Sequence, residues 1–252
     1  MSKAIFAVLA GSVALAAITL FVPGRGSAQA EHEQTGALGE PVLLELFTSQ
    51  GCSSCPPADQ LAERLASEED LVVIARPVTY WDRLGWRDTL AREENTDLQR
   101  DYARSGLAGY NGVYTPQLVV DGAIGEVGSY ERDVRQNIAL ARGSQQAAIR
   151  VAETDNGGVR VGLGGVANDT AELMLMAVSR SERVAIGRGE NGGRNITYTN
   201  VLIDERVLAR WDGGKRALNI APSQLRVRGA NRYALVLREP NGGEVLAARW
   251  IP

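Results

Sequence analysis

The hydrophobic and polar positions divide the chain into two parts with different patterns. Between residues 41 and 143, short apolar runs alternate with segments whose apolar residues recur every three or four positions, as in buried strands and amphipathic helices. The predicted order is strand, helix, strand, helix, strand, strand and helix, at residues 41–47, 56–65, 71–75, 88–104, 117–120, 123–127 and 129–141. In the first of these helices, Asp59 is expected on the solvent face.

After residue 143 the pattern changes to short alternating segments, which are separated by turns rich in Gly and Asn. Many short strands at this spacing are typical of a small β-sandwich. We therefore expect an α/β domain at residues 41–143, followed by a smaller all-β, sandwich-like domain at residues 144–252.

The N-terminal 30 residues have the order of a secretory signal peptide. Lys3 precedes an apolar run at residues 4–22, and small residues end at Ala28-Gln29-Ala30. This order predicts a signal peptide at 1–30 that is cleaved after Ala30, and a periplasmic or secreted protein. A retained membrane anchor is the alternative, because the run is nearly long enough to span a bilayer. Residues 31–40 are polar and are expected to be a flexible lead-in.

Composition excludes several classes of function. The 252 residues carry a net charge of −3, which argues against nucleic acid as a partner and, once the signal is removed, against a membrane. The chain contains two Cys and one His, too few for a zinc site with four such ligands. A Ser-His-Asp or Cys-His catalytic arrangement is also disfavoured, because the single imidazole, His32, lies in the lead-in. No metal and no cofactor are expected, and the oligomeric state is undetermined.

The two cysteines, Cys52 and Cys55, lie three positions apart between a predicted strand and a predicted helix. A thiolate is the reactive form in disulfide exchange, and a helix N-terminus favours its negative charge. We therefore expect Cys52 to be exposed and to attack first, and Cys55, one helical turn in, to resolve the mixed disulfide. A structural disulfide and a copper(I) site are the two alternatives.

Several segments resemble known proteins. Glu45–Asp59, Tyr80–Asp82, Leu84–Trp86 and Gly189–Arg194 resemble a bacterial family of secreted thioredoxin-like proteins catalogued as domain of unknown function 1223. Within this resemblance, residues 42–142 look like a thioredoxin fold with a helical insertion. The resemblance implies a fold and a compartment, but no substrate.

Four further residues are candidates for the site, and Trp81 is one of them because it follows a parallel strand whose C-terminal end should open on the side of the cysteines. Thr115 and Pro116 look like the Thr-cis-Pro element of thioredoxin-fold proteins, which shapes the substrate groove beside the cysteines. Trp81 is expected to contribute to substrate binding as part of an aromatic lid, or else to pack an inserted helix onto the sheet. Glu45, the only charge in its buried strand, is a candidate proton shuttle for the resolving thiol.

These observations predict an exported thiol–disulfide oxidoreductase that acts on proteins or on small thiols and disulfides. The alternative is a non-catalytic interaction protein, in which a thioredoxin-fold scaffold carries a β-sandwich binding module.

Overall fold

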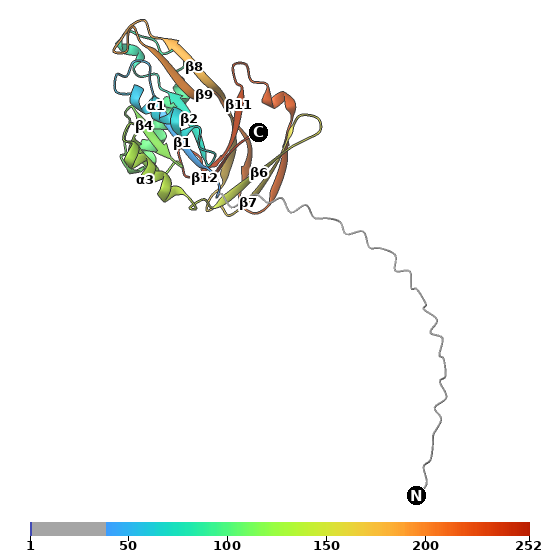
Figure 1. Ribbon diagram of the computed structural model, residues 1–252. Helices are drawn as coiled ribbons and strands as arrows, with labels where there is room; N and C mark the ends of the chain where they lie inside the picture. Colours follow the sequence, from blue (N-terminus) through green and yellow to red (C-terminus); the bar gives the residue numbers. More distant parts are fainter. Residues whose placement is uncertain (2–38) are drawn as a thin grey trace. The chain divides into compact units, whose positions relative to one another are not determined.

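The computed structural model describes Met1 and residues 39–252. The predicted signal peptide and nearly all of the lead-in therefore lie outside the described residues. From residue 39 onward the chain belongs to one compact unit, whose sheets and helices are shown in Figure 1. Within this described part, no helix is both long enough and apolar enough to cross a membrane.

A nine-stranded mixed sheet runs through this unit. In spatial order its strands are β12 (Val245–Trp250), β11 (Arg232–Arg238), β8 (Ala171–Ala185), β9 (Asn195–Trp211), β2 (Leu71–Pro77), β1 (Val42–Thr48), β4 (Gln117–Val120), β5 (Ile124–Val127) and β3 (Ala108–Gly109). β1 pairs in parallel with β2 and antiparallel with β4. All seven residues of both β1 and β2 are buried, as expected for strands that are covered on both faces.

Helices cover both faces of the sheet around β1. Alternate residues of β1 point to opposite faces, and Leu44 and Leu46 pack with helices α1 (Pro56–Leu65) and α3 (Glu131–Ala141). On the other face, Phe47 packs against Tyr102 of α2 (Glu93–Ser105). α1 and α2 therefore lie on opposite sides of β1, which decides what each side chain of β1 can contact.

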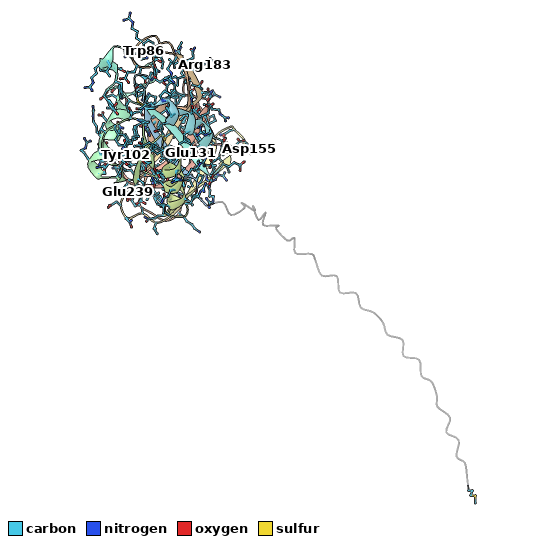
Figure 2. The ribbon with its side chains drawn as sticks, turned by 60° about the vertical axis from the view of Figure 1, so that its left-hand side comes forward. Trp86, Tyr102, Glu131, Asp155, Arg183 and Glu239 are labelled. Carbon is cyan, nitrogen blue, oxygen red and sulfur yellow. A yellow bond between two sulfur atoms is a disulfide. The ribbon has the colours of Figure 1, made fainter. Side chains whose placement is uncertain are left out.

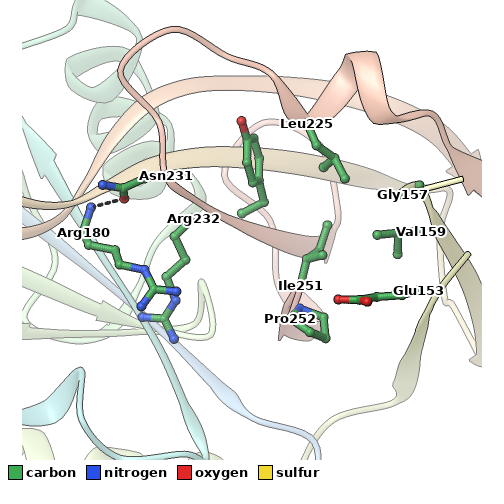
Figure 3. Close-up of a pocket in the computed structure, with 11 residues that line it drawn as sticks. Glu153, Gly157, Val159, Arg180, Leu225, Asn231, Arg232, Ile251 and Pro252 are labelled. Atoms are coloured by element: carbon green, nitrogen blue, oxygen red, sulfur yellow. Dashed lines mark hydrogen bonds between the residues drawn. The ribbon is translucent and has the colours of Figure 1, made fainter. Parts of the chain in front are cut away.

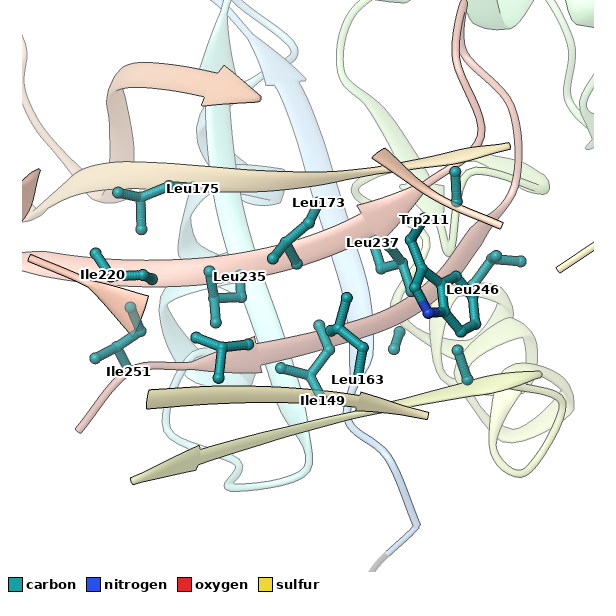
Figure 4. Packing of buried hydrophobic residues seen from close by; sticks show 14 of the residues in the cluster. Ile149, Leu163, Leu173, Leu175, Trp211, Ile220, Leu235, Leu237, Leu246 and Ile251 are labelled. Carbon is teal, nitrogen blue, oxygen red and sulfur yellow. The ribbon is translucent and has the colours of Figure 1, made fainter. Parts of the chain in front are cut away.

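A second, three-stranded sheet contains β10 (Arg216–Ile220), β7 (Val159–Gly165) and β6 (Ala147–Glu153). It packs against β8, β11 and β12 through a cluster of buried apolar side chains (Figure 4). Trp211 is the largest side chain of this cluster and is 1% exposed. Two short 3-10 helices, η1 (Asp82–Leu84) and η2 (Pro222–Leu225), lie in the connections.

The predicted fold class is wrong. An α/β thioredoxin-like domain with a helical insertion, followed by a separate smaller β-sandwich, would place the two halves of the chain in different sheets. Instead, strands from residues 171–250 continue the sheet begun by residues 42–127, and β9 joins β2 in parallel at Val201 and Ala75. The alternation of residues predicts which segments are strands, but it does not predict which strands become hydrogen-bonded neighbours.

β8 and β9 form an antiparallel hairpin of 15 and 17 residues, longer than the other strands of the described chain. The part of the hairpin nearest its turn packs on Trp86 and Leu90 through Val184, Ile186 and Ile196. The hairpin thereby carries its connecting loop, residues 186–194, to the region where β1 ends and α1 begins. We call these nine residues the cap loop.

Candidate functional site

The cysteine loop, residues 49–55, joins the end of β1 to the start of α1. Cys52 and Cys55 form a disulfide with 5.4 Å between their Cα atoms. The Cys52 amide donates to the Ser49 carbonyl at 3.2 Å, and the Cys55 amide donates to the Cys52 carbonyl, also at 3.2 Å. These two turns place the sulfur pair at the N-terminus of α1, where unpaired amides favour a thiolate.

The cap loop covers the cysteine loop. The side-chain amide of Asn191 donates to the carbonyl of Gln50 at 3.0 Å and to the carbonyl of Cys52 at 2.8 Å. The Ser53 amide donates to the Glu190 carboxylate at 3.1 Å, and hydrogen bonds from Ser53 lower the pKa of Glu190. Asn191 is 0% exposed, so it fills the space between the two loops.

The prediction that Cys52 is exposed is wrong for this oxidised protein. Both cysteines are 0% exposed. The position of Cys52 before the helix would leave it open to solvent, but Asn191 reaches it from a loop 139 residues further along the chain. A long-range contact therefore covers the backbone of Cys52.

Two tryptophans lie beside the same two loops. The Trp86 indole donates to the side-chain oxygen of Gln50 at 2.8 Å, and its ring packs on Gly187 of the cap loop, where a Cβ would lie 3.0 Å from the ring. Trp81 packs on Gly51 of the cysteine loop, where a Cβ would lie 3.1 Å from the Trp81 Cβ. Figure 2 shows Trp86 at the same end of the molecule as Arg183 of the β8–β9 hairpin.

The peptide bond between Thr115 and Pro116 is cis, as predicted. The Trp81 indole donates to the Thr115 hydroxyl at 2.8 Å, so Trp81 joins this segment to the cysteine loop. The Pro116 carbonyl accepts from the amide of Gly128, at which a Cβ would lie 3.3 Å from Ala58 of α1. The structure thus brings Trp81, Thr115 and Pro116 together with the cysteine loop and α1.

A buried carboxyl group lies one helical turn beyond Cys55. Asp59 is 3% exposed, contrary to the prediction that it faces solvent. Its Oδ1 accepts from the Thr48 hydroxyl at 2.8 Å, whereas its Oδ2 has no hydrogen-bond partner among the described residues. Burial raises the pKa of Asp59 to about 8; the Thr48 hydrogen bond opposes this shift and the nearby charge of Asp88 adds to it. Asp59 is therefore largely protonated at neutral pH.

Tyr198 of β9 and Asp88 extend this buried polar cluster. The Tyr198 hydroxyl is buried and has no partner within the described part of the chain, and burial, with the charges of Asp59 and Asp88, raises its pKa. Asp88 accepts from the Gln50 amide at 2.8 Å, and burial raises its pKa as well. Protonatable groups from three segments thus lie together beside the cysteine loop.

Glu45 lies on the opposite face of β1 from α1. Its carboxylate pairs with Arg76 at 2.6 Å and with Arg238 at 2.7 Å, and it accepts a hydrogen bond from the Tyr102 hydroxyl. Burial alone would raise the pKa of Glu45, but Arg238, Arg76 and Tyr102 together lower it to about 2. These contacts keep Glu45 ionised and argue against the predicted proton-shuttle role. Asp59, on the face of β1 that packs against α1, has a pKa near neutral pH.

The family follows from the sequence match. Residues 43–238 match the family model described as "Protein of unknown function (DUF1223)". The chain belongs to this family. The match begins in β1, ends in β11, and includes the cysteine loop and the cap loop. No curated protein matches the chain.

Two solved structures are similar to this DUF1223 chain. The crystal structure of protein AGR_C_4864 from Agrobacterium tumefaciens has 27% sequence identity and a TM-score of 0.71, over 83% of this chain and 93% of that chain. HBP35 of Porphyromonas gingivalis has 11% identity and a TM-score of 0.55, over 86% of this chain and 76% of that chain. At 11% identity, the similarity to HBP35 shows a related fold and nothing more.

Sequence reasoning missed two residues of the site, Asp59 and Asn191. A signal for Asp59 exists, because it follows Cys55 by four positions and residues at this spacing share a helix face. For Asn191 the sequence offers the family resemblance of Gly189–Arg194 but no sign that it contacts the cysteine loop, because an Asn followed by two Gly is typical of an exposed turn. Across residues 39–252, no group of three or more His, Cys, Asp or Glu side chains is placed to hold a metal ion.

Proposed function

We propose that this protein is a thiol–disulfide oxidoreductase in which Cys52 and Cys55 exchange disulfides with a substrate. The observation that carries the proposal is the Cys52–Cys55 disulfide at the N-terminus of α1, beside a buried carboxyl group with a pKa near neutral pH. A bridge that closes so short a loop should contribute about 2 kcal/mol to stability, less than one that closes a long loop. Disulfide exchange therefore explains a bridge between Cys52 and Cys55 better than stabilisation of the fold does.

The proposed reaction starts from the oxidised protein. A substrate thiolate attacks the Cys52 sulfur, and the Cys52–Cys55 bond breaks to release the Cys55 thiolate. The second substrate thiol then attacks the mixed disulfide, so that the substrate leaves as a disulfide and the protein is left with two thiols. Two electrons and two protons pass from substrate to protein. In the reverse direction Cys52 attacks first and Cys55 resolves. No cofactor takes part in either direction.

Asp59 is proposed to handle the proton of Cys55. The Asp59 amide donates to the Cys55 carbonyl at 3.1 Å, so the two residues are separated by one helical turn and project from the same face of α1. The protonated Asp59 carboxyl can donate to the Cys55 thiolate as the disulfide opens, and the carboxylate can take the proton back as the disulfide closes.

Trp81, Thr115 and Pro116 are proposed to form the substrate-binding side of the site. Trp81 contacts Gly51 and is hydrogen-bonded to Thr115. A protein segment or a small thiol bound at Cys52 would lie beside these residues. We propose that access to Cys52 requires the cap loop to move, because Cys52 is 0% exposed and Asn191 of the cap loop binds its carbonyl.

A second candidate function is a non-catalytic interaction protein in which the disulfide only holds the cysteine loop. The complete burial of both cysteines favours it. The two candidates differ in what the single-cysteine variants do, so one experiment separates them.

The test uses Cys55→Ala and Cys52→Ala. Exchange through Cys52 predicts that the single thiol of Cys55→Ala attacks disulfide-containing substrates and accumulates mixed disulfides, because no second thiol of the protein resolves them. These complexes should appear on non-reducing gels and disappear with reductant. Cys52→Ala should accumulate almost none, because Cys55, the N-cap residue of α1, is proposed to resolve the mixed disulfide and not to attack the substrate. Wild-type protein should also catalyse the reduction of insulin by dithiothreitol. If neither variant traps a partner, both lose stability alike and insulin is not reduced faster, the scaffold function replaces the enzymatic one.

We further propose that the protein is exported to the periplasm or secreted. The proposal rests on the N-terminal sequence, with Lys3, the apolar run and Ala28-Gln29-Ala30. An oxidising compartment would keep the Cys52–Cys55 pair as the disulfide seen here.

A further inference from the structure

A pocket unrelated to the cysteines lies where the nine-stranded sheet meets the start of β7 (Figure 3). Its volume is about 340 Å³, within the range of roughly 300–1,000 Å³ that is usual for small-molecule sites. One part of its wall is apolar and contains Val159, Leu225 and Ile251. Another part contains Arg180 of β8 and Arg232 of β11. All its lining residues lie outside the cysteine loop and the cap loop.

The two arginines are neighbours across the β8–β11 pair. Arg232 lies opposite Val178, so Arg180 is its diagonal neighbour, within reach of a long side chain. Figure 3 shows the two guanidinium groups together at one end of the pocket. Burial and the charge of Arg180 lower the pKa of Arg232. Within residues 39–252, neither guanidinium forms an ion pair.

The guanidinium group of Arg232 is held by an aromatic ring and by a hydrogen bond. Its guanidinium carbon lies 3.6 Å from the centroid of the Trp250 ring, and its Nη1 donates to the Asn200 side chain at 3.4 Å. The Trp250 indole is in turn fixed by its hydrogen bond to the Leu71 carbonyl at 3.1 Å. The Arg180 amide donates to the Asn231 side chain at 2.8 Å, which ties the start of β11 to β8. At least one of the two cations is therefore positioned before any ligand arrives.

We propose that this pocket binds a small organic acid, with its carboxylate between Arg180 and Arg232 and its apolar body against Val159, Leu225 and Ile251. Two adjacent guanidinium groups repel each other, and an anion that bridges them removes the repulsion and accepts charge-assisted hydrogen bonds. The apolar wall favours a ligand with a hydrocarbon body over a bare inorganic anion.

Glu153 also lines the pocket and restricts the ligand further. In Figure 3 its carboxylate lies beside Pro252, away from the guanidinium pair. A second negative charge at that end of a ligand would be repelled. The preferred ligand is therefore a monocarboxylate with an uncharged body, and dicarboxylates should bind more weakly.

Isothermal titration calorimetry on the full-length chain tests this assignment, with octanoate as the probe. Octanamide supplies the same body without the charge, and inorganic phosphate supplies charge without the body. The variants are Arg180→Gln and Arg232→Gln. The control is Arg132→Gln on α3, which removes an exposed arginine elsewhere. Arg180 is itself exposed, so Arg180→Gln should leave the core intact even if Arg232→Gln, which loses the Trp250 contact, does not fold.

The assignment predicts that octanoate binds the wild type and Arg132→Gln equally, and that Arg180→Gln weakens its binding about tenfold or more. Octanamide and phosphate should each bind at least about tenfold more weakly than octanoate. No octanoate binding, or equal octanoate affinity in Arg180→Gln, would overturn the assignment. If octanamide bound as tightly as octanoate, the carboxylate charge would have no role in binding. If phosphate bound as tightly as octanoate, the apolar wall would have none. Either result overturns the proposal.

Discussion

Substitution of Asn191 by Ala should make the buried disulfide easier to reduce. The change removes two hydrogen bonds to the carbonyls of Gln50 and Cys52 and leaves the backbone of the cap loop in place. A neutral hydrogen bond contributes about 0.5–1.5 kcal/mol net, so opening of the cap loop should become easier by about 1–3 kcal/mol. At 1.4 kcal/mol for each factor of ten, this corresponds to a fraction of open molecules that is roughly 5 to 150 times larger.

The measurement is the rate at which excess dithiothreitol reduces the Cys52–Cys55 bond, followed by quenching with a thiol-alkylating reagent and separation by mass. When opening is rare and fast, the observed rate is proportional to the open fraction, so the rate should rise by the same factor. Asn195→Ala is the matched control, because Asn195 is exposed in the same hairpin and should leave the rate unchanged. Equal rates for wild type and Asn191→Ala would refute the idea that the cap loop restricts access. A faster rate of disulfide reduction in both Asn191→Ala and Asn195→Ala would indicate that the hairpin as a whole has become less stable.

Three further predictions concern pH, charge and processing. Because burial raises the pKa of Asp59 from 3.8 to about 8, the folded protein holds a proton that the unfolded chain has lost between these values. Stability should therefore fall as the pH rises through this window, and Asp59→Asn should reduce the slope of the urea midpoint against pH. The remaining slope is due to Asp121, whose pKa is raised by burial to about 7, and to Asp88, whose pKa burial also raises. Glu45→Gln removes the carboxylate that pairs with two buried arginines and should lower the free energy of unfolding in urea by about 3–5 kcal/mol. This loss should exceed that of Glu205→Gln, at the partly exposed end of the network. Since the pKa of Glu45 is lowered from 4.5 to about 2, the stability that Glu45 contributes in the wild type is fully present above pH 4.5 and is lost as the pH falls toward 2. N-terminal sequencing of exported protein should begin at Glu31, and a product that starts at Met1 and sediments with membranes would contradict cleavage.

Local features of the fold and site could be predicted from the sequence. The strand–loop–helix arrangement around Cys52 follows from an apolar run, a turn and two prolines, and all of these act within a few residues. Asp121-Gly122 between two apolar runs is a hairpin turn signal in the sequence, and the structure has a turn there with φ values of 45° and 68° at the two residues. Such features depend on neighbours in the chain, which the sequence displays directly.

The remaining features depend on contacts between distant segments. Asp59 lies at the edge of the apolar face of α1, so the helical pattern leaves its burial undecided until Thr48 and the β8–β9 hairpin are placed around it. Asn191 has the sequence surroundings of an exposed turn, and only the length of β8 and β9 carries it to the cysteine loop. Strand pairing is likewise non-local, and for this reason the joining of β9 to β2 was not predicted.

The position of the cap loop late in the chain has a consequence for how the protein is made. Asn191 follows Cys52 by 139 residues. At about 5–20 residues per second, ribosomes need roughly 7 to 30 seconds to add that length of chain. Throughout this interval the two cysteines have been synthesised but the cap loop has not, so the pair is open to any thiol reagent or redox enzyme that reaches the nascent chain. If the cap loop restricts access as proposed, closing of the hairpin fixes the oxidation state that the pair has acquired, and later exchange by the proposed mechanism is limited by the rate at which the hairpin opens.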